Sequence, residues 1–237
     1  MAVIVGIHIM FKKTKPYLII TDTHTPYHHK GILEFYKNIH KEYKCNDQII
    51  HLGDLFDFHA ISEFTKEPGT PTALDEYNRG FEFTQQLCKI FPKGVLVLGN
   101  HDVRPENALK KMGIPPEFLK SWDELLGLGK GWKVEPLYHV IKEFDVLCEH
   151  RGGAGPNGAL NTAIFKRTSF AQGHVHSEAG VHYSANHNSL IFGMNAGSGA
   201  DNTSLAMCYG KYQKKKGVIG CGIVFNGSHA EFKPMKL

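Results

Sequence analysis

Three short apolar runs in the first half of the chain each end in polar residues. They cover residues 18–21, 49–52 and 95–98, and they lead into Asp22, Asp54 and Asn100. The third run is four β-formers without alternation, which predicts a strand buried on both faces, as in a parallel sheet. Polar side chains that follow such strands stand at the carboxyl edge of the sheet, where open α/β sheets place their ligands. We therefore expect the three strand ends to meet at one site.

The segments between and after these runs predict the rest of the fold. Apolar residues recur at helical spacing over residues 28–43 and 72–91, which gives two β-α-β units with parallel strands and right-handed crossovers. Residues 105–128 predict an interrupted helix whose second piece begins at Pro115-Pro116. After Gly131, short β-type runs over residues 137–141, 145–148, 189–192 and 218–225 alternate with Gly and Asn. This pattern predicts a second, mainly antiparallel sheet.

Length and composition narrow the class of protein. The 237 residues fit a single domain over residues 1–237, with residues 1–16 as an N-terminal extension or edge strand. The apolar start lacks preceding basic residues, which argues against a signal peptide, and no apolar run approaches the about 18 residues of a membrane span. The net charge of +4 fits an anionic substrate but not a surface that coats nucleic acid. The five cysteines form no CxxC pair, which indicates reduced thiols and a cytoplasmic location.

Five short motifs carry the candidate chemistry. In chain order they are Asp22-x-His24, Gly53-Asp54-x-x-Asp57, Gly99-Asn100-His101-Asp102, Glu149-His150 and Gly173-His174-x-His176. From residue frequencies, chance gives HxH about once, but GDxxD only about 0.04 times and GNHD about 0.003 times. Asp, Asn and His without Cys form a ligand set for Mn, Fe, Zn, Mg or Ni. Two such cations ~3.5–4 Å apart, bridged by a carboxylate and a hydroxide, lower the pKa of bound water to about 7.

The motifs together resemble those of the calcineurin-like metallophosphoesterase superfamily, in particular its compact bacterial and phage-type members, from about Leu18 to about Phe232. The resemblance implies an α/β fold, a four-layer α/β/β/α sandwich of two facing mixed sheets flanked by helices. It implies two divalent metal ions, Mn first and Fe, Zn, Mg or Ni as alternatives. The first metal would be held by Asp22, His24, Asp54 and His176, and the second by Asp54 as a bridge, Asn100, His150 and His174. His101 would be the catalytic histidine, and Asp57 the carboxylate that orients it.

Several residues near the motifs have two interpretations. His139 and His182 are alternatives to His150, because Arg151 follows His150 where the family usually has Gly. Arg151 would bind a substrate phosphate or would be a solvated side chain on a loop. Arg104 would reach a substrate phosphate or would form a surface ion pair. His59 lines a substrate pocket or lies at the surface. Asp102 caps the turn that follows it or supports His101. Phe58 stands where Ser/Thr protein phosphatases carry Arg, which argues against that branch.

We therefore expect a phosphoester hydrolase with two metal ions, in which a bridging hydroxide attacks phosphorus. A phosphomonoesterase acting on nucleotides or small phosphates is the first hypothesis, because the chain is short and its charge is mild. A phosphodiesterase or nuclease acting on DNA, RNA or cyclic nucleotides is the alternative. A binding scaffold without catalysis is the remote one, since such proteins lose ligands and this chain has a candidate for each.

Overall fold

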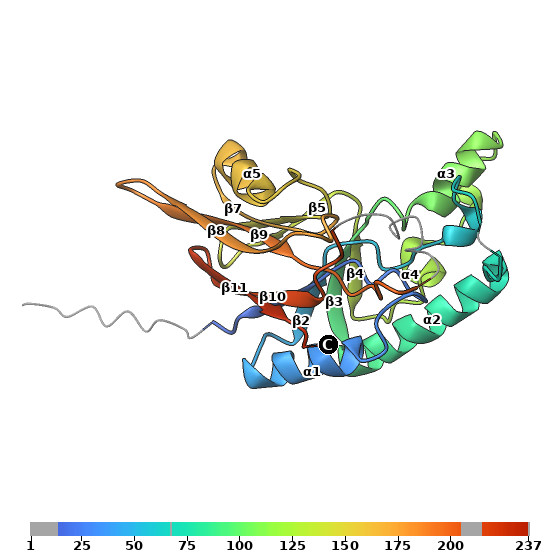
Figure 1. Ribbon diagram of the computed structural model, residues 1–237, viewed down its shortest axis with the longest axis horizontal. Coiled ribbons are helices and arrows are strands. Elements are labelled where there is room, and N and C mark those ends of the chain that lie inside the picture. Colours follow the sequence, from blue (N-terminus) through green and yellow to red (C-terminus); the bar gives the residue numbers. More distant parts are fainter. Residues whose placement is uncertain (1–13, 67, 205–214, 237) are drawn as a thin grey trace, which may run out of the picture.

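The computed structural model describes residues 14–66, 68–204 and 215–236. The prediction of an extension or edge strand at the N-terminus falls on residues 1–16, of which residues 1–13 lie outside the described part. Two sheets lie face to face, with helices on both outer faces (Figure 1). The order from top to bottom is helix α5, one sheet, the other sheet, and helices α1 and α2. This arrangement confirms the four-layer α/β/β/α sandwich.

The first sheet contains the three strands whose ends carry the first motifs. Its order is β11-β10-β1-β2-β3-β4, and β1 (Tyr17–Ile20), β2 (Gln48–His51), β3 (Lys93–Val97) and β4 (Trp132–Glu135) run parallel. Strands β10 (Gly220–Asn226) and β11 (His229–Pro234) complete it in antiparallel pairing. Every residue of β1 is buried, as the unbroken apolar run predicts.

Two long helices cover the outer face of the first sheet. Helix α1 (Ile32–Glu42) connects β1 to β2, and α2 (Ala73–Ile90) connects β2 to β3. The side chain of Thr72 accepts a hydrogen bond from the Asp75 backbone N–H at 3.2 Å, which fixes the start of α2. A short 3-10 turn, η1 (His59–Ile61), precedes α2. Both β-α-β units are therefore present as predicted.

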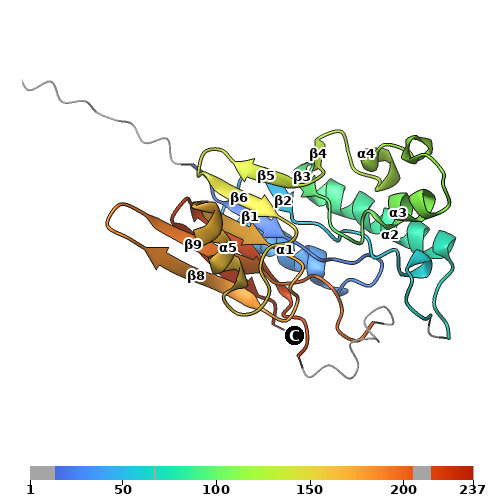
Figure 2. The same ribbon diagram turned by 90° about the horizontal axis from the view of Figure 1, so that it is seen from above.

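The predicted interrupted helix consists of three separate pieces. They are α3 (Arg104–Lys111), the 3-10 turn η2 (Pro116–Phe118) and α4 (Trp122–Leu125). Gly113 has a φ of +69°, a left-handed conformation that favours glycine and ends the first piece. Figure 2 shows this group of short helices at the end of the molecule opposite to β8 and β9.

The second sheet differs from its prediction in two respects. Its order is β5-β6-β7-β9-β8, with β5 (Tyr138–Ile141), β6 (Val146–Glu149), β7 (Ser169–Gln172), β8 (Ala179–Ala185) and β9 (Leu190–Ala196). The sheet is mixed, because β6, β7 and β9 run parallel and helix α5 (Gly158–Lys166) provides the crossover from β6 to β7. The run over residues 218–225 forms β10, which pairs with β1 in the first sheet. The apolar pattern identified a strand there, but it did not specify which sheet that strand joins.

The space between the two sheets is apolar and brings their strand ends together. Ile19, Ile50 and Val97 of the first sheet pack in one cluster with Cys148 and Met194 of the second. Their chain neighbours face the helices instead, because side chains alternate along a strand. The carboxyl ends of β1, β2 and β3 consequently lie next to those of β6 and β7. Among the described residues, no helix has the length and apolar character needed to cross a membrane.

Candidate metal centre

Loops at the carboxyl ends of five strands form the site. The loops after β1 and β2 are joined by hydrogen bonds from Asp22 N to Gly53 O at 3.0 Å and from His24 N to Asp54 O at 2.9 Å. The loop after β3 joins them where His101 N donates to Asp54 Oδ1 at 2.8 Å. The loops after β6 and β7 complete the site, and it contains all seven predicted metal ligands, Asp22, His24, Asp54, Asn100, His150, His174 and His176.

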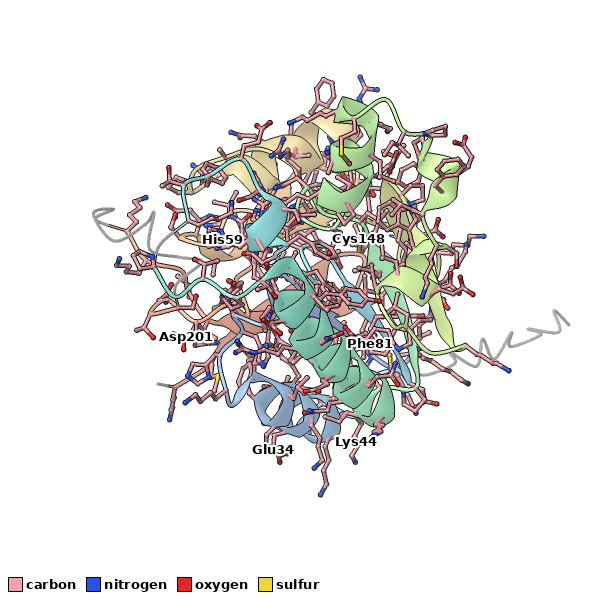
Figure 3. The ribbon with its side chains drawn as sticks, turned by 90° about the vertical axis from the view of Figure 1, so that its right-hand side faces the viewer. Glu34, Lys44, His59, Phe81, Cys148 and Asp201 are labelled. Atoms are coloured by element: carbon pink, nitrogen blue, oxygen red, sulfur yellow. The ribbon has the colours of Figure 1, made fainter. Side chains whose placement is uncertain are left out.

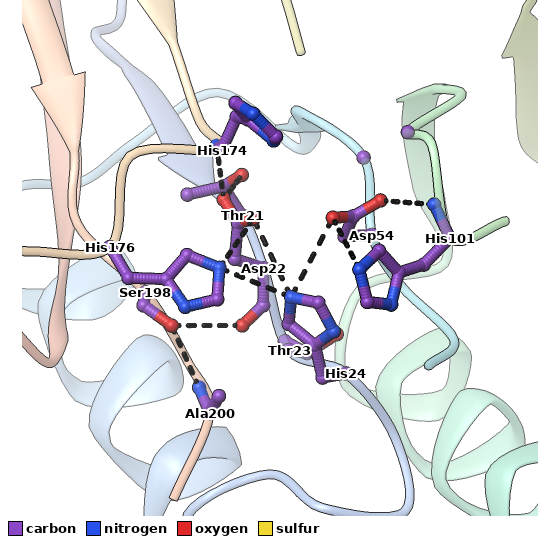
Figure 4. Close-up of polar contacts among 12 residues, drawn as sticks. Thr21, Asp22, Thr23, His24, Asp54, His101, His174, His176, Ser198 and Ala200 are labelled. Atoms are coloured by element: carbon purple, nitrogen blue, oxygen red, sulfur yellow. Dashed lines mark hydrogen bonds and ion pairs between the residues drawn. The ribbon is translucent and has the colours of Figure 1, made fainter. Parts of the chain in front are cut away.

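The first cluster of ligand atoms comes from the loops after β1 and β7. Asp22, His24 and His176 each offer one atom, and these atoms all lie within 4.8 Å of one another. His176 Nε2 lies 3.0 Å from Asp22 Oδ1 and 3.1 Å from His24 Nε2 (Figure 4). Two imidazole nitrogens directed at each other beside a carboxylate form a donor set that suits a divalent transition metal.

A second cluster of ligand atoms includes Asp54 itself. It comprises Asp54, His150 and His174, again within 4.8 Å. His150 Nε2 lies 3.3 Å from Asp54 Oδ2 and 3.1 Å from Asn100 Oδ1. The same Asp54 oxygen is 3.6 Å from His24 Nε2, so it lies between the two clusters. Neither cluster contains His139 or His182; these lie in β5 and β8.

The buried carboxylates and imidazoles of the site shift each other's pKa values. Burial acts to raise the pKa of Asp22, but His176 and the hydrogen bond from His24 outweigh it and hold the pKa well below the usual range. Burial acts to lower the pKa of His150, but the Asp54 carboxylate outweighs it and raises the pKa to about 9. The carboxylates of Asp22 and Asp54 therefore stay ionised, and His24 and His150 beside them are held in the protonated form. A divalent cation would displace these protons, because imidazole binds metals in its neutral form.

Several of the ligand positions have an unusual backbone conformation. Asp22, His24, Asp54 and His174 have φ values of 49°, 47°, 51° and 65°. This left-handed region costs on the order of 1–3 kcal/mol for a residue other than glycine, and such residues cluster at functional sites. The surrounding hydrogen bonds hold them there. His174 N, for example, donates to Asp22 Oδ2 at 2.8 Å.

His101, Asp57 and Arg104 form a group beside the clusters. His101 Nδ1 lies 3.1 Å from the Asp57 backbone oxygen and 3.4 Å from Asp57 Oδ1. The other carboxylate oxygen of Asp57 lies 2.9 Å from His24 Nδ1. Arg104 Nη1 donates to the Asp57 carboxylate at 3.0 Å and to its backbone oxygen at 2.7 Å. Asp57 is thus shared by the predicted catalytic histidine and by a predicted metal ligand, and Arg104 forms its ion pair inside the site.

The remaining candidates have different surroundings. Asp102 is buried, and its two oxygens accept hydrogen bonds from Phe56 N at 3.0 Å and Gly99 N at 2.8 Å. Neither expected role applies, because its side chain joins the loops after β2 and β3 and does not cap α3. His59 is buried with its ring 6.2 Å from that of Tyr27, so the expectation of a surface position is wrong. Arg151 is exposed, and its Nη2 lies 3.4 Å from Asn100 Oδ1.

Three supporting residues had no signal in the sequence. Thr21 Oγ1 donates to Asp22 Oδ2 at 2.5 Å, and Ser198 Oγ donates to the Asp22 backbone oxygen at 3.1 Å. Glu76 of α2 accepts hydrogen bonds from the backbone of His59 at 2.6 Å and of Ala60 at 2.7 Å. In Figure 3, His59 accordingly lies beside α2. Thr21 is adjacent to Asp22, but the contacts of Ser198 and Glu76 join separate segments of the chain, so no local motif reveals those two.

One of three comparisons with known proteins bears on this site. The family model described as calcineurin-like phosphoesterase matches residues 15–196. No curated protein matches the chain. Among solved structures, a protein of unknown function from Aquifex aeolicus is 18% identical, with a TM-score of 0.35, and the match covers 73% of this chain and 82% of that one. A TM-score this low adds nothing to the assignment. The family match includes all five motifs, and the chain belongs to the calcineurin-like phosphoesterase family.

Proposed function

We propose that the protein hydrolyses phosphoesters with two divalent cations bound at the two clusters. Asp22, His24, Asp54 and His176 would hold the first cation, and Asp54, Asn100, His150 and His174 the second. The position of Asp54 Oδ2, 3.6 Å from His24 Nε2 and 3.3 Å from His150 Nε2, supports this most strongly, because a bridging carboxylate must face both ligand sets. Mn²⁺ is the cation that we propose first, since the donors are a mixture of carboxylate oxygen and imidazole nitrogen.

The metal ions would supply an activated water nucleophile and neutralise charge on the phosphoryl group. His101 is placed to act on the same group. Its Nδ1 faces the Asp57 carbonyl oxygen, an acceptor, and therefore carries a proton. Nε2 then lies on the site side of the ring, 3.9 Å from Asp54 Oδ2 and 3.1 Å from Arg104 Nη2. In this arrangement Nε2 accepts a hydrogen bond from Arg104, so His101 would stabilise phosphoryl oxygens or protonate the leaving oxygen only after Nε2 takes up a proton in place of that hydrogen bond.

Arg104 and Arg151 are the proposed anchors for the free phosphoryl oxygens. The Arg104 side chain is only 15% exposed and is fixed by Asp57, so it offers a positioned positive charge. Arg151 lies in the loop after β6, and its Nη2 reaches Asn100 Oδ1. His59 is buried and held by Glu76, and we propose that it supports the loop after β2 and does not touch substrate.

The test is hydrolysis of 4-nitrophenyl phosphate by protein loaded with Mn²⁺. His101→Ala should lower kcat by about 10²–10⁴-fold, the usual contribution of a general acid, without loss of bound metal. His187→Ala, an exposed histidine, is the matched control and should behave as wild type. Activity that survives both His101→Ala and chelation would refute the mechanism. Failure to bind Mn²⁺ would favour a binding scaffold instead.

A further inference from the structure

Two cavities adjoin the metal centre, and Asn100 lies in the wall of both. One, of about 560 Å³, lies towards β5 and β6, where Leu137, Tyr138 and Arg151 form part of its wall. The other, of about 400 Å³, lies between η1 and α3, where Ile61, Arg104 and Lys111 contribute. In Figure 3, η1, which is marked by His59, lies beside α3. Both volumes fall in the range of about 300–1,000 Å³ that small-molecule sites occupy.

The first cavity combines exposed apolar side chains with a positive charge. Leu137 and Tyr138 are 74% and 53% exposed. Exposed apolar groups gathered beside a polar site indicate a binding surface. Arg151 lies next to them and contacts the Asn100 amide oxygen, and among the described residues it forms no ion pair with a carboxylate. An aromatic ring joined to a phosphate would satisfy both features, by stacking on Tyr138 and by pairing with Arg151.

The second cavity has the same combination on the other side of Asn100. Ile61 is 38% exposed, and Arg104 forms the inner wall. Lys111 forms an ion pair with Glu63 at the rim, and both side chains are largely exposed. Such exposed pairs are worth little, so a phosphate of the substrate can replace Glu63 at low cost. This cavity therefore also fits an organic group that carries a negative charge.

We propose that the substrate is a phosphodiester with a nucleoside-sized group on each side of the cleaved phosphate, such as a short single-stranded nucleic acid. The proposal rests on the function proposed above. A phosphomonoester has one organic group and would fill one cavity. A cyclic nucleotide has both ester oxygens on one sugar and would do the same. The net charge of +4 fits a short strand better than a long duplex, whose binding depends on many phosphate contacts.

The first experiment compares three substrates with the Mn²⁺-loaded protein. They are a nucleoside 5′-monophosphate, a 3′,5′-cyclic nucleotide, and a dinucleotide joined by one phosphodiester. We expect kcat/KM for the dinucleotide to exceed the other two values by about tenfold or more. A preference for the monophosphate or the cyclic nucleotide would overturn the inference and leave the proposed function intact. If neither these compounds nor 4-nitrophenyl phosphate is hydrolysed, the proposed function itself fails.

The second experiment tests the two cavities separately. Tyr138→Ala should raise KM for the dinucleotide about tenfold, within the effect of losing one stacked base. Leu137→Ala, outside the strands, is a second test of the same cavity should Tyr138→Ala disturb β5. Lys111→Ala tests the other cavity and should raise KM about threefold, as expected for one exposed phosphate contact. Phe165→Ala, on α5 and 84% exposed, is the control. If Tyr138→Ala, Leu137→Ala and Lys111→Ala all keep the wild-type KM, the inference is wrong.

Discussion

Replacement of Asp57 by Asn tests how the site is held together. The Asp57 carboxylate is buried, with one oxygen 2.9 Å from His24 Nδ1 and the other 3.0 Å from Arg104 Nη1. Burial acts to raise the pKa of Asp57, but hydrogen bonds from His101 and His24 outweigh it and keep the pKa far below the usual range. The Asn side chain keeps the shape, removes the charge, and replaces one accepting oxygen by an NH₂ group that must face a donor.

The expected magnitude follows from the role of His24 as a proposed metal ligand. Removing the group that orients a ligating histidine typically lowers metal affinity by about 10–100-fold. At 1.36 kcal/mol for each factor of ten, this corresponds to about 1.4–2.7 kcal/mol of binding free energy. Asp57 also lies 3.4 Å from His101 Nδ1, so a second effect on kcat is expected that does not depend on metal concentration.

The assay separates the two effects. Mn²⁺ affinity is measured by calorimetric titration, and kcat is measured on an aryl phosphate at saturating Mn²⁺. Asp47→Asn is the control, because Asp47 is exposed and its ion pair with Lys15 lies at the surface. A Mn²⁺ affinity within about twofold of wild type would refute the role assigned to Asp57 through His24. A loss confined to kcat would place its whole contribution on His101.

Three further predictions concern other parts of the site. Glu76→Gln removes one of two charge-assisted hydrogen bonds to η1 and should destabilise the protein by about 1.5–3 kcal/mol. Calorimetry should then show a Tm lower by about 3–12 °C. The control Glu82→Gln, at an exposed position of α2, should change Tm little. Burial and the nearby positive charge of Arg79 lower the pKa of His28 from 6.5 to about 4. Between these pH values the unfolded chain binds more protons than the folded protein. The folded protein therefore loses stability as pH falls from 6.5 towards 4. His28→Phe should abolish at most about 3 kcal/mol of this loss, measured by urea unfolding at pH 7.5 and pH 4.5, and an identical loss in both proteins would contradict it. Gly99→Ala would put a Cβ 2.1 Å from Asp54 Oδ1, so we expect metal analysis to find less bound Mn²⁺, and an unchanged content would show that the loops can separate.

Much of the fold followed from local sequence patterns. The unbroken apolar run before Gly99 and the helical spacing on either side of it predicted parallel strands with helical crossovers, and β1, β2 and β3 confirm this. Each motif lies where its strand ends, so the sequence also predicted which edge of the sheet carries the polar side chains. These features depend on the periodicity of residues that are close together in the chain, so the sequence alone can show them.

Only the tertiary structure decided how these parts are joined. The sequence predicted β10 as a strand, but hydrogen bonding to β1 places it in the first sheet. The left-handed backbone of Asp22 and Asp54, the contact between Asp57 and His24, and the link from Asp102 to Phe56 all depend on segments that meet only after folding. Sequence periodicity records which face of an element is apolar, and it carries no information on which distant element covers that face. The sequence therefore predicted the residue types of the site. The distances between these residues and their hydrogen-bond partners depend on how one sheet packs on the other.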